Sequence, residues 1–273
     1  MNAAAATEAP AAMGARVCPQ CGNAQMRVLR KYSEESWRVV DCMACHGFVY
    51  LQNAPAYDRL ADELAWEKTF VTERERRRVS YPWVNFIERM TRWRLLHLPG
   101  KRTRIYRRLF KNGRVLDVGC GGGHSIPEPY IPFGIEISNA LAKEAHARMS
   151  ARGGRAVCAP AIEGIALFSD RYFSGVVLSS FLEHEANPKP LLQQVARVIA
   201  DDGKAYIRVP NFGSLNRRVM GSKWCGFRHP DHVNYFTSRS LRRMAMDCGL
   251  RMRLINPFLL PFNDNINAVL SKA

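Results

Sequence analysis

The amino-acid sequence predicts a doubly wound, mostly parallel α/β sheet preceded by a small zinc ribbon and a helical connector. From residue 114 onward, short apolar runs alternate with segments of helical periodicity, which is typical of a parallel sheet covered by helices on both faces. Two Cys-x-x-Cys pairs stand near the N-terminus. A basic stretch with apolar residues at helical spacing lies between these two parts.

Length and composition set the scale of the fold. The chain has 273 residues, 47% of them hydrophobic, which suffices for one α/β domain and a small appendage. No apolar run approaches the roughly 18 residues that a membrane-spanning helix needs. Residues 1–15 are rich in alanine and lack a basic residue, so we interpret them as a disordered leader and not as a secretion signal. Eight cysteines without such a signal indicate a reducing compartment, and we expect a cytoplasmic protein.

Residues 16–54 are predicted to form the zinc ribbon. Four thiolates at this spacing suit a tetrahedral zinc site, and the expected ligands are Cys18, Cys21, Cys42 and Cys45. His46 could replace Cys45 as a ligand, although we interpret it as an exposed neighbour. Strands are indicated near residues 26–29 and 37–40. We expect the zinc to be structural, because so small a unit has little core of its own.

Residues 55–112 are predicted to form a basic helical connector or lid. Between Lys68 and Arg114 there are 15 basic and 3 acidic residues, a large part of the net charge of +16. Such a span is typical of a surface for nucleic acid or acidic substrates, and a contact with a membrane surface also fits. A solvated helical face in a basic protein fits as well. Charge alone does not decide between these interpretations.

Residues 113–273 are predicted to form the α/β domain. Strands are indicated at residues 115–118, 134–137, 155–158, 173–178, 204–209 and 251–255. Helices are indicated at residues 139–152, 190–200 and 238–248, the first with Ser138 as its N-cap. Because few residues follow Asn256, we expect the last strand to be short or missing.

The first of these strands leads into a turn with glycines at alternate positions, Gly119, Gly121 and Gly123. Glycine lets the backbone reverse tightly and lets a ligand approach where a Cβ would collide. The next strand ends near Glu136, whose ionised carboxylate offers only acceptors and so suits the two hydroxyls of a ribose. This arrangement predicts a nucleoside-binding half-site.

The nucleoside is expected to carry no pyrophosphate. A dinucleotide-binding turn reads G-x-G-x-x-G, but His124 occupies its last position. Pro127, Pro129 and Pro132 then leave room for little more than one turn of the helix on which a pyrophosphate would rest. S-adenosylmethionine (AdoMet) has an adenosine, a sulfonium and an amino-acid tail but no phosphate, so it meets both conditions.

At this point the chain resembles the class I AdoMet-dependent methyltransferases, a family with a Rossmann-like fold whose first motif has the form V-L-D-x-G-C-G-x-G. Residues 115–123 read V-L-D-V-G-C-G-G-G. Residues 183–188 resemble the family's E-H-x-x-x-P turn, and residues 224–236 its W…P-x-H-x-x-x-F segment. These last segments are similar to those of a subset that acts largely on small molecules, sugars and quinone-like acceptors.

The resemblance implies roles for individual residues. The methionine tail would be held by Asp117, Gly119, Gly121 and Gly123. The ribose would be held by Glu136. The turn after the third strand would flank the adenine through Ala161, Ile162 and Glu163. The first crossover has the shortest length that a parallel connection permits, so how completely the tail is enclosed stays open.

Two histidines are candidates for the methyl-transfer step. His184 lies at the carboxyl end of the fourth strand, where open sheets bind ligands, and could act as a general base or cap its loop. His232 lies on the loop that would face the acceptor, or it packs against Trp224. In quinone-pathway relatives a metal is held by E-x-x-E-H. Ser180 stands in place of the first acid here, which argues against a catalytic metal.

The sequence therefore predicts an AdoMet-dependent methyltransferase that acts on a small-molecule or glycan-like acceptor. One alternative is an RNA methyltransferase that grips phosphates with the zinc ribbon and the basic helices. Another is a non-catalytic zinc-ribbon adaptor. The acceptor, the atom that is methylated and the oligomeric state are not fixed by the sequence.

Overall fold

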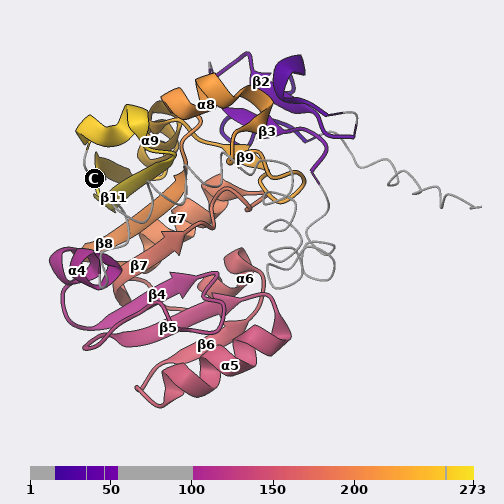
Figure 1. Ribbon diagram of the computed structural model, residues 1–273. Helices are drawn as coiled ribbons and strands as arrows, with labels where there is room; N and C mark the ends of the chain where they lie inside the picture. Colours follow the sequence, from indigo (N-terminus) through magenta and orange to yellow (C-terminus); the bar gives the residue numbers. More distant parts are fainter. Residues whose placement is uncertain (1–15, 35, 46, 55–100, 256) are drawn as a thin grey trace, which may run out of the picture.

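The computed structural model describes residues 16–34, 36–45, 47–54, 101–255 and 257–273 (Figure 1). The predicted leader, His46 and the predicted connector up to residue 100 lie outside the described residues.

A seven-stranded sheet forms the centre of the α/β domain (Figure 1). Its strand order is β10-β11-β8-β7-β4-β5-β6. The strands are β4 (Arg114–Val118), β5 (Ile131–Glu136), β6 (Arg155–Cys158), β7 (Phe173–Ser179), β8 (Ile199–Pro210), β10 (Leu250–Leu254) and β11 (Asn265–Lys272). Strands β4 to β8 run parallel, whereas β11 is antiparallel to both of its neighbours. The predicted mostly parallel, doubly wound sheet is confirmed.

Helices cover both faces of this sheet. Successive residues of a strand point to opposite faces. Accordingly, Val115 packs in one cluster with Tyr106 and Phe110 around α4 (Lys101–Leu109), whereas Leu116 packs in the main core. That main core also contains buried residues of helices α6 (Ala161–Ala166), α7 (Pro188–Val198) and α9 (Ser238–Asp247).

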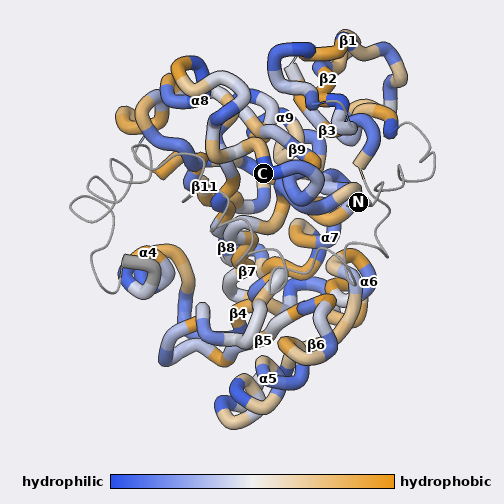
Figure 2. The backbone as a smooth tube through the Cα atoms, turned by 45° about the vertical axis from the view of Figure 1, so that its right-hand side comes forward, coloured by the Kyte–Doolittle hydropathy of each residue, from blue (hydrophilic) through white to orange (hydrophobic). Residues whose placement is uncertain are grey.

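Helix α5 (Asn139–Ser150) begins as predicted, because the Ser138 side chain accepts a hydrogen bond from the Leu141 amide at 3.4 Å. Its buried residues are Ala142, Ala145 and Met149, one stripe along the helix. Both hydrophilic and hydrophobic segments follow its turns in Figure 2. The helix therefore lies on the sheet with a single apolar face inward.

The C-terminal strand corrects one prediction. We expected the strand after Asn256 to be short or missing, but β11 has eight residues. The short helix η3 (Pro257–Phe262) uses only six residues, which leaves enough chain to cross the sheet. Ile266, Ala268 and Leu270 then point into the core at alternate positions. β8 also begins earlier than predicted, at Ile199, with a register shift opposite Phe173 and Gly175.

The first crossover contains no helix, in agreement with the effect expected of its prolines. Residues 119–130 run from β4 to β5 as turns and extended chain. Arg152 donates hydrogen bonds to the carbonyl oxygens of Ile126 and Tyr130, both at 2.7 Å. The Tyr130 hydroxyl in turn donates to the Tyr106 carbonyl at 3.0 Å. These contacts fix a connection that has no secondary structure of its own.

The cysteine-rich segment contributes β1 (Met26–Val28), β2 (Val39–Cys42) and β3 (Val49–Leu51) to a second sheet. The fourth strand of this sheet is β9 (Asn234–Tyr235), which comes from the α/β domain and pairs antiparallel with β3. Both parts of the chain therefore share one sheet, an arrangement that sequence periodicity did not predict.

Arg16 reinforces this junction from within. Its guanidinium donates hydrogen bonds to the carbonyl oxygens of Ala186 at 2.6 Å, Val233 at 3.1 Å and Leu51 at 3.3 Å. It also donates to the Asn234 side chain at 3.0 Å. Burial lowers the pKa of Arg16 to about 10, so the side chain is still charged at neutral pH. One cation thus holds both parts of the chain.

We predict that Arg16→Met lowers the free energy of unfolding by roughly 2–4 kcal/mol, because several acceptors at the junction lose a charged donor. Arg27→Met is the control: Arg27 pairs with Asp41 on the surface, where such pairs contribute under about 1 kcal/mol. Urea unfolding of both variants measures the difference. Equal losses would show that Arg16 does not hold the junction.

Candidate functional site

The candidate site lies at the carboxyl ends of β4 and β7. β4 lies between β5, the next strand along the chain, and β7, a later one. The strand order therefore reverses beside β4, and open α/β sheets bind their ligands at such a point. The turn after β4 carries the three glycines, and the turn after β7 carries residues 180–184.

The three glycines of the turn have positive φ angles, which residues with a side chain rarely adopt. Gly119 has φ 73°, and a Cβ there would lie 2.4 Å from the Phe181 ring. Gly121 has φ 53°, but no described heavy atom lies within 4 Å of where its Cβ would be. Gly119 thus lets the two turns touch, whereas Gly121 borders open space. Ser180 also has a positive φ of 58°, so both turns hold unusual backbone at this point.

Glu136 holds the glycine turn in place. One carboxylate oxygen accepts a hydrogen bond from the Gly121 amide at 2.9 Å, and the other from the Ser138 amide at 3.0 Å. A carboxylate has about four lone-pair sites, so two are left for a ligand. The buried Asp117, on β4, accepts a hydrogen bond from the Ser125 hydroxyl. Ser125 was not identified from the sequence, because nothing in its neighbourhood marks it as a partner.

The predicted adenine-flanking residues lie at the start of a helix. We predicted a turn at Ala161, Ile162 and Glu163, but these are the first three residues of α6. Ala161 is buried, whereas Glu163 is exposed. The helix begins directly after Pro160, which suits the turn before a helix. The Ala159 amide donates to the Glu136 carbonyl at 3.1 Å, so the start of α6 lies beside the end of β5.

The structure brings His184 and His232 together. Their ring centroids are 4.7 Å apart at an interplanar angle of 83°. Nδ1 of His184 is 2.9 Å from the Asp231 carbonyl oxygen, and Nδ1 of His232 is 2.8 Å from that of Gly226. Burial, together with the charge of Arg228, lowers the pKa of His184 to about 4. The metal-free imidazole is therefore neutral at pH 7.

Glu183 lies beside these histidines; the sequence placed it in the E-H-x-x-x-P turn but did not give it a role in the site. Its side chain is 1% exposed, and its Oε2 atom has no hydrogen-bond partner among the described residues. Burial raises the pKa of Glu183 to about 8, against the opposing charges of Arg208 and Arg228. The sequence signal that could have identified Glu183 as a site residue is its position next to His184, just after a buried strand.

The four predicted zinc ligands also converge. The sulfur atoms of Cys18 and Cys45 are 3.7 Å apart, and those of Cys21 and Cys42 are 3.6 Å apart. All four sulfurs lie within 4.8 Å of one another. Four sulfurs bound to one zinc at about 2.3 Å would be about 3.8 Å apart, so the cluster has the right size for that ion.

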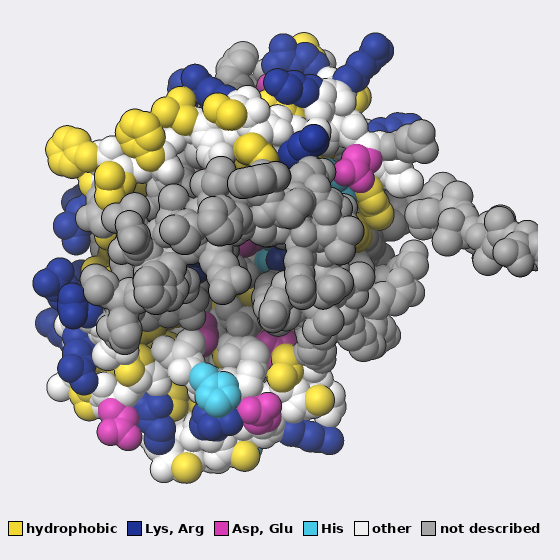
Figure 3. Space-filling model, viewed as in Figure 1, with side chains coloured by type: hydrophobic (Ala, Val, Ile, Leu, Met, Phe, Trp, Pro, Cys, Tyr) yellow, Lys and Arg dark blue, Asp and Glu magenta, His cyan; other side chains and the backbone are white. Residues whose placement is uncertain are grey.

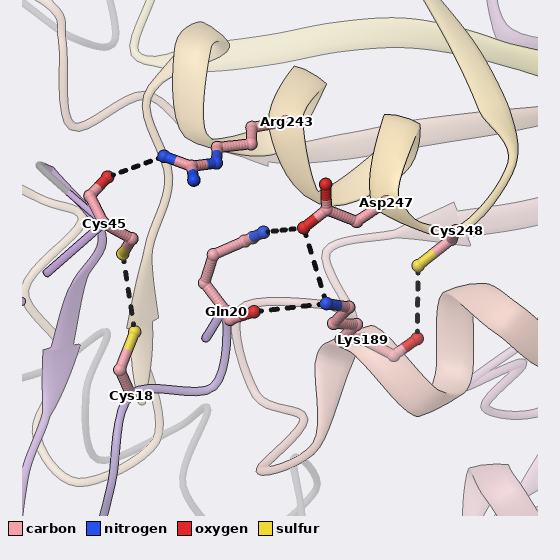
Figure 4. A network of polar contacts seen from close by, with 7 residues as sticks. All are labelled: Cys18, Gln20, Cys45, Lys189, Arg243, Asp247 and Cys248. Atoms are coloured by element: carbon pink, nitrogen blue, oxygen red, sulfur yellow. Dashed lines mark hydrogen bonds and ion pairs between the residues drawn. The ribbon is translucent and has the colours of Figure 1, made fainter. Parts of the chain in front are cut away.

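Polar contacts connect this cysteine cluster to the helices of the α/β domain (Figure 4). Arg243 of α9 donates to the Cys45 carbonyl oxygen at 3.1 Å. The side-chain amide of Gln20 donates a hydrogen bond to the Asp247 carboxylate, also on α9, at 2.6 Å. Lys189 of α7 lies 3.4 Å from both Asp247 and the Gln20 carbonyl oxygen. The cluster is thus attached to the α/β domain beyond the shared sheet.

Part of the predicted basic span is described. Helix α4 carries exposed arginines at positions 104, 107 and 108. Lysine and arginine side chains gather over this helix on the left of Figure 3. Lys111, just beyond the helix, pairs with Asp202. Among the described residues, no helix has the length and apolar character needed to cross a membrane.

Comparison with known proteins identifies the family. A sequence profile described as a methyltransferase domain matches residues 90–255, more than half of the chain, so the protein belongs to this methyltransferase family. Its fold is similar to that of an S-adenosylmethionine-dependent methyltransferase from Clostridium acetobutylicum, with a TM-score of 0.53 and 10% identity over 70% of this chain and 98% of that one. A SAM-dependent methyltransferase from Archaeoglobus fulgidus gives a TM-score of 0.51 and 20% identity, covering 63% of this chain and 91% of that one.

Two curated proteins are also similar to this chain. The chain is 25% identical over 152 residues to the ubiquinone biosynthesis O-methyltransferase of Nitrosomonas europaea, covering 50% of this chain and 63% of that protein. It is 25% identical over 146 residues to an uncharacterized protein of Methanocaldococcus jannaschii, covering 53% of this chain and 68% of that protein. The matches thus span about two thirds of the relatives' length.

We predict that Gly119→Ala destabilises the protein by about 2–4 kcal/mol, through left-handed strain and overlap with the Phe181 ring. Gly249→Ala is a matched control, because Gly249 has φ 72° but no described atom within 4 Å of an added Cβ. Its cost should be only about 1 kcal/mol, from the backbone alone. Thermal unfolding of both variants tests this. Equal losses of stability would mean that the contact between Gly119 and Phe181 does not require the absence of a Cβ.

Proposed function

We propose that the protein transfers the methyl group of AdoMet to a small-molecule or glycan-like acceptor at the carboxyl ends of β4 and β7. The observation that carries this proposal is the contact between two turns. No described atom lies within 4 Å of where a Cβ of Gly121 would be, and Gly119 touches Phe181, three residues before His184. A cofactor on the first turn would thus lie beside an acceptor on the second.

The chain's own residues would bind and orient the cofactor. The methionine tail lies in the open space at Gly121, with Asp117, Gly119 and Gly123 completing the turn around it. The ribose hydroxyls donate to Glu136, whose remaining lone pairs are available. The adenine lies against the start of α6, at Ala161, Ile162 and Glu163. The absence of a helix in the first crossover fits a ligand without pyrophosphate.

Methyl transfer is an in-line displacement: the acceptor atom forms a bond to the methyl carbon, and the sulfur keeps the electron pair of the broken bond. Because the sulfonium already activates this carbon, most of the catalysis comes from holding the reactants in line. An acceptor hydroxyl must also lose its proton. His184, with His232 beside it, is neutral at pH 7 and so offers a lone pair for this step.

The acceptor class is inferred from this chemistry and from one relative. The Nitrosomonas europaea protein is named for O-methylation in ubiquinone biosynthesis. Two histidines at the predicted acceptor side fit a hydroxyl acceptor, because a hydroxyl needs a base to become a good nucleophile, whereas a neutral amine or a thiolate is already one. We therefore favour transfer to oxygen on a small molecule.

The zinc is proposed to be structural. Residues 16–54 form the zinc ribbon, bound through Cys18, Cys21, Cys42 and Cys45, and residues 113–273 form the AdoMet-binding domain. The eight cysteines form no disulfide in the structure. A closed set of four thiolates leaves no position for a substrate.

We predict that AdoMet binds the protein with measurable heat in calorimetry and that Gly121→Val abolishes this heat. Valine would fill the space in which we place the methionine tail. Gly22→Val is the matched control, since Gly22 also has a positive φ and open space but lies in the ribbon. His184→Asn should keep the heat and lose methyl transfer. Failure of the unmodified protein to bind AdoMet would favour the non-catalytic adaptor.

The exposed arginines of α4 favour one second candidate, an RNA methyltransferase. RNA bound through phosphates dissociates steeply as salt rises, with a log–log slope of about −0.7 for each phosphate on a single strand. Replacing Arg104, Arg107 and Arg108 with glutamine should make this slope shallower by about 2. Replacing the exposed Arg251 and Arg253 of β10 is the control. Undetectable or salt-insensitive RNA binding would exclude this candidate.

A further inference from the structure

A row of three polar side chains crosses the sheet at the carboxyl ends of β7 and β8. Ser179 of β7 is paired with Arg208 of β8, and Arg208 is paired with Asn267 of β11. Residues that are paired across neighbouring strands point to the same face of a sheet. All three are half-buried. Ser179, Arg208 and Asn267 therefore form one polar row on one face.

This face is the one that carries Asp117. Asp117 is paired with Val177, and Val177 with Tyr206, which lies two residues before Arg208 and so points to the same side. Val177 and Tyr206 are buried in the apolar cluster around α4. From the spacing of strands and residues, the Cα atoms of Asp117 and Arg208 are roughly 12 Å apart. That separation leaves room for a small acceptor between the methionine tail and the polar row.

The charge of Arg208 is not neutralised by another part of the protein that the structure describes. Its side chain has no hydrogen-bond or ion-pair partner among the described residues. Burial raises the pKa of Glu183 to about 8 although the charges of Arg208 and Arg228 oppose this, so the Glu183 carboxyl is mostly protonated at pH 7. Arg228 differs from Arg208, because it pairs with Asp231 at 2.9 Å. Arg208 is thus a half-buried cation that lacks an anion.

Asn267 offers a second donor beside this cation. The Tyr206 hydroxyl donates to Oδ1 of Asn267 at 2.8 Å, which orients the amide and leaves its Nδ2 atom without a partner among the described residues. Opposite residues of an antiparallel pair have Cβ atoms about 5 Å apart, so the donors of Arg208 and Asn267 can reach one ligand group. The Arg208 carbonyl oxygen also accepts from the Ser180 amide at 2.8 Å, which attaches the row to the turn that carries His184.

The charge balance favours a carboxylate as the bound group. A guanidinium matches the geometry of both carboxylates and phosphates. A phosphate monoester, however, carries close to two negative charges near neutral pH, whereas a carboxylate carries one. Arg208 supplies one positive charge, and Asp117 and Glu136 add carboxyl groups, not cations, to the same end of the sheet. One guanidinium and one amide therefore suit a singly charged anion.

We propose that Arg208 and Asn267 bind a carboxylate of the acceptor, so that the substrate is a hydroxy carboxylic acid with its hydroxyl near His184. This inference rests on the proposed function, because it concerns the acceptor of that methyl transfer. Arg208 is then a specificity-determining residue. The carboxylate stays ionised and unmethylated throughout, while the hydroxyl oxygen forms the bond to the methyl carbon and His184 takes the hydroxyl proton.

The charge of the methylated product tests the proposal. The protein is incubated with methyl-labelled AdoMet and the small-molecule fraction of a cell extract, and the labelled product is applied to an anion exchanger at pH 7. We expect retention that is lost once carbodiimide has coupled the product's carboxyl groups to methylamine. An unretained product, or retention that phosphatase abolishes, overturns the proposal. Absence of any labelled product would instead refute the proposed function, so the two failures are distinguishable.

Kinetics with the retained acceptor test Arg208 itself. Arg208→Gln should raise KM for the acceptor about 10- to 100-fold, the loss expected for a charged hydrogen bond, with little change in kcat. Arg208→Lys keeps the charge and should recover part of this loss. Arg253→Gln is the matched control, because Arg253 is exposed on β10 of the same sheet and should keep the original KM. Retained AdoMet heat shows that each variant is folded. An unchanged KM in Arg208→Gln, or a loss confined to kcat, overturns the proposal.

Discussion

The turn at Glu183 depends on one set of backbone hydrogen bonds, and much of the molecule depends on that turn. The Glu183 carbonyl oxygen accepts from the amides of Val233 and Asn234. The Asn234 side chain donates to the carbonyls of Leu182 and Glu185, at 3.0 and 2.7 Å. Because these groups are buried, losing them would leave acceptors without partners. The segment that closes the ribbon sheet thus also shapes the turn after β7.

This junction gives the N-terminal cysteine-rich segment a structural role beyond the zinc binding that we propose for it. β3 pairs with β9, which begins two residues after His232. Arg16 and the contacts of α9 hold the same region from two further directions. The position of the proposed acceptor site is therefore set by both domains. A separate docking module on a flexible tether would show none of these shared contacts.

The fold was largely predictable, because its signals are local. The apolar run ending in Val118, the glycine turn and the cap at Ser138 each depend on a few neighbouring residues. The long strand β11 was not predicted, because its length depends on how few residues η3 uses. The cluster at Glu183 was missed for a related reason. His232 lies far from it in sequence, and the amides of Val233 and Asn234 bring it there by donating to the Glu183 carbonyl oxygen. Arg16 carried no signal either, since its partners are backbone carbonyls.

The shared sheet also cannot be completed until late in synthesis of the chain, because its strands lie far apart in the sequence. The ribbon's first three strands lie within residues 26–51, whereas its fourth is at residues 234–235. A ribosome therefore releases the N-terminal cysteines long before the strand that covers the outer edge of β3. Until then that edge has unpaired amides and carbonyls, open to pairing with another chain. Completion of the small N-terminal sheet is thus a late event, reached only after residue 235 has been made.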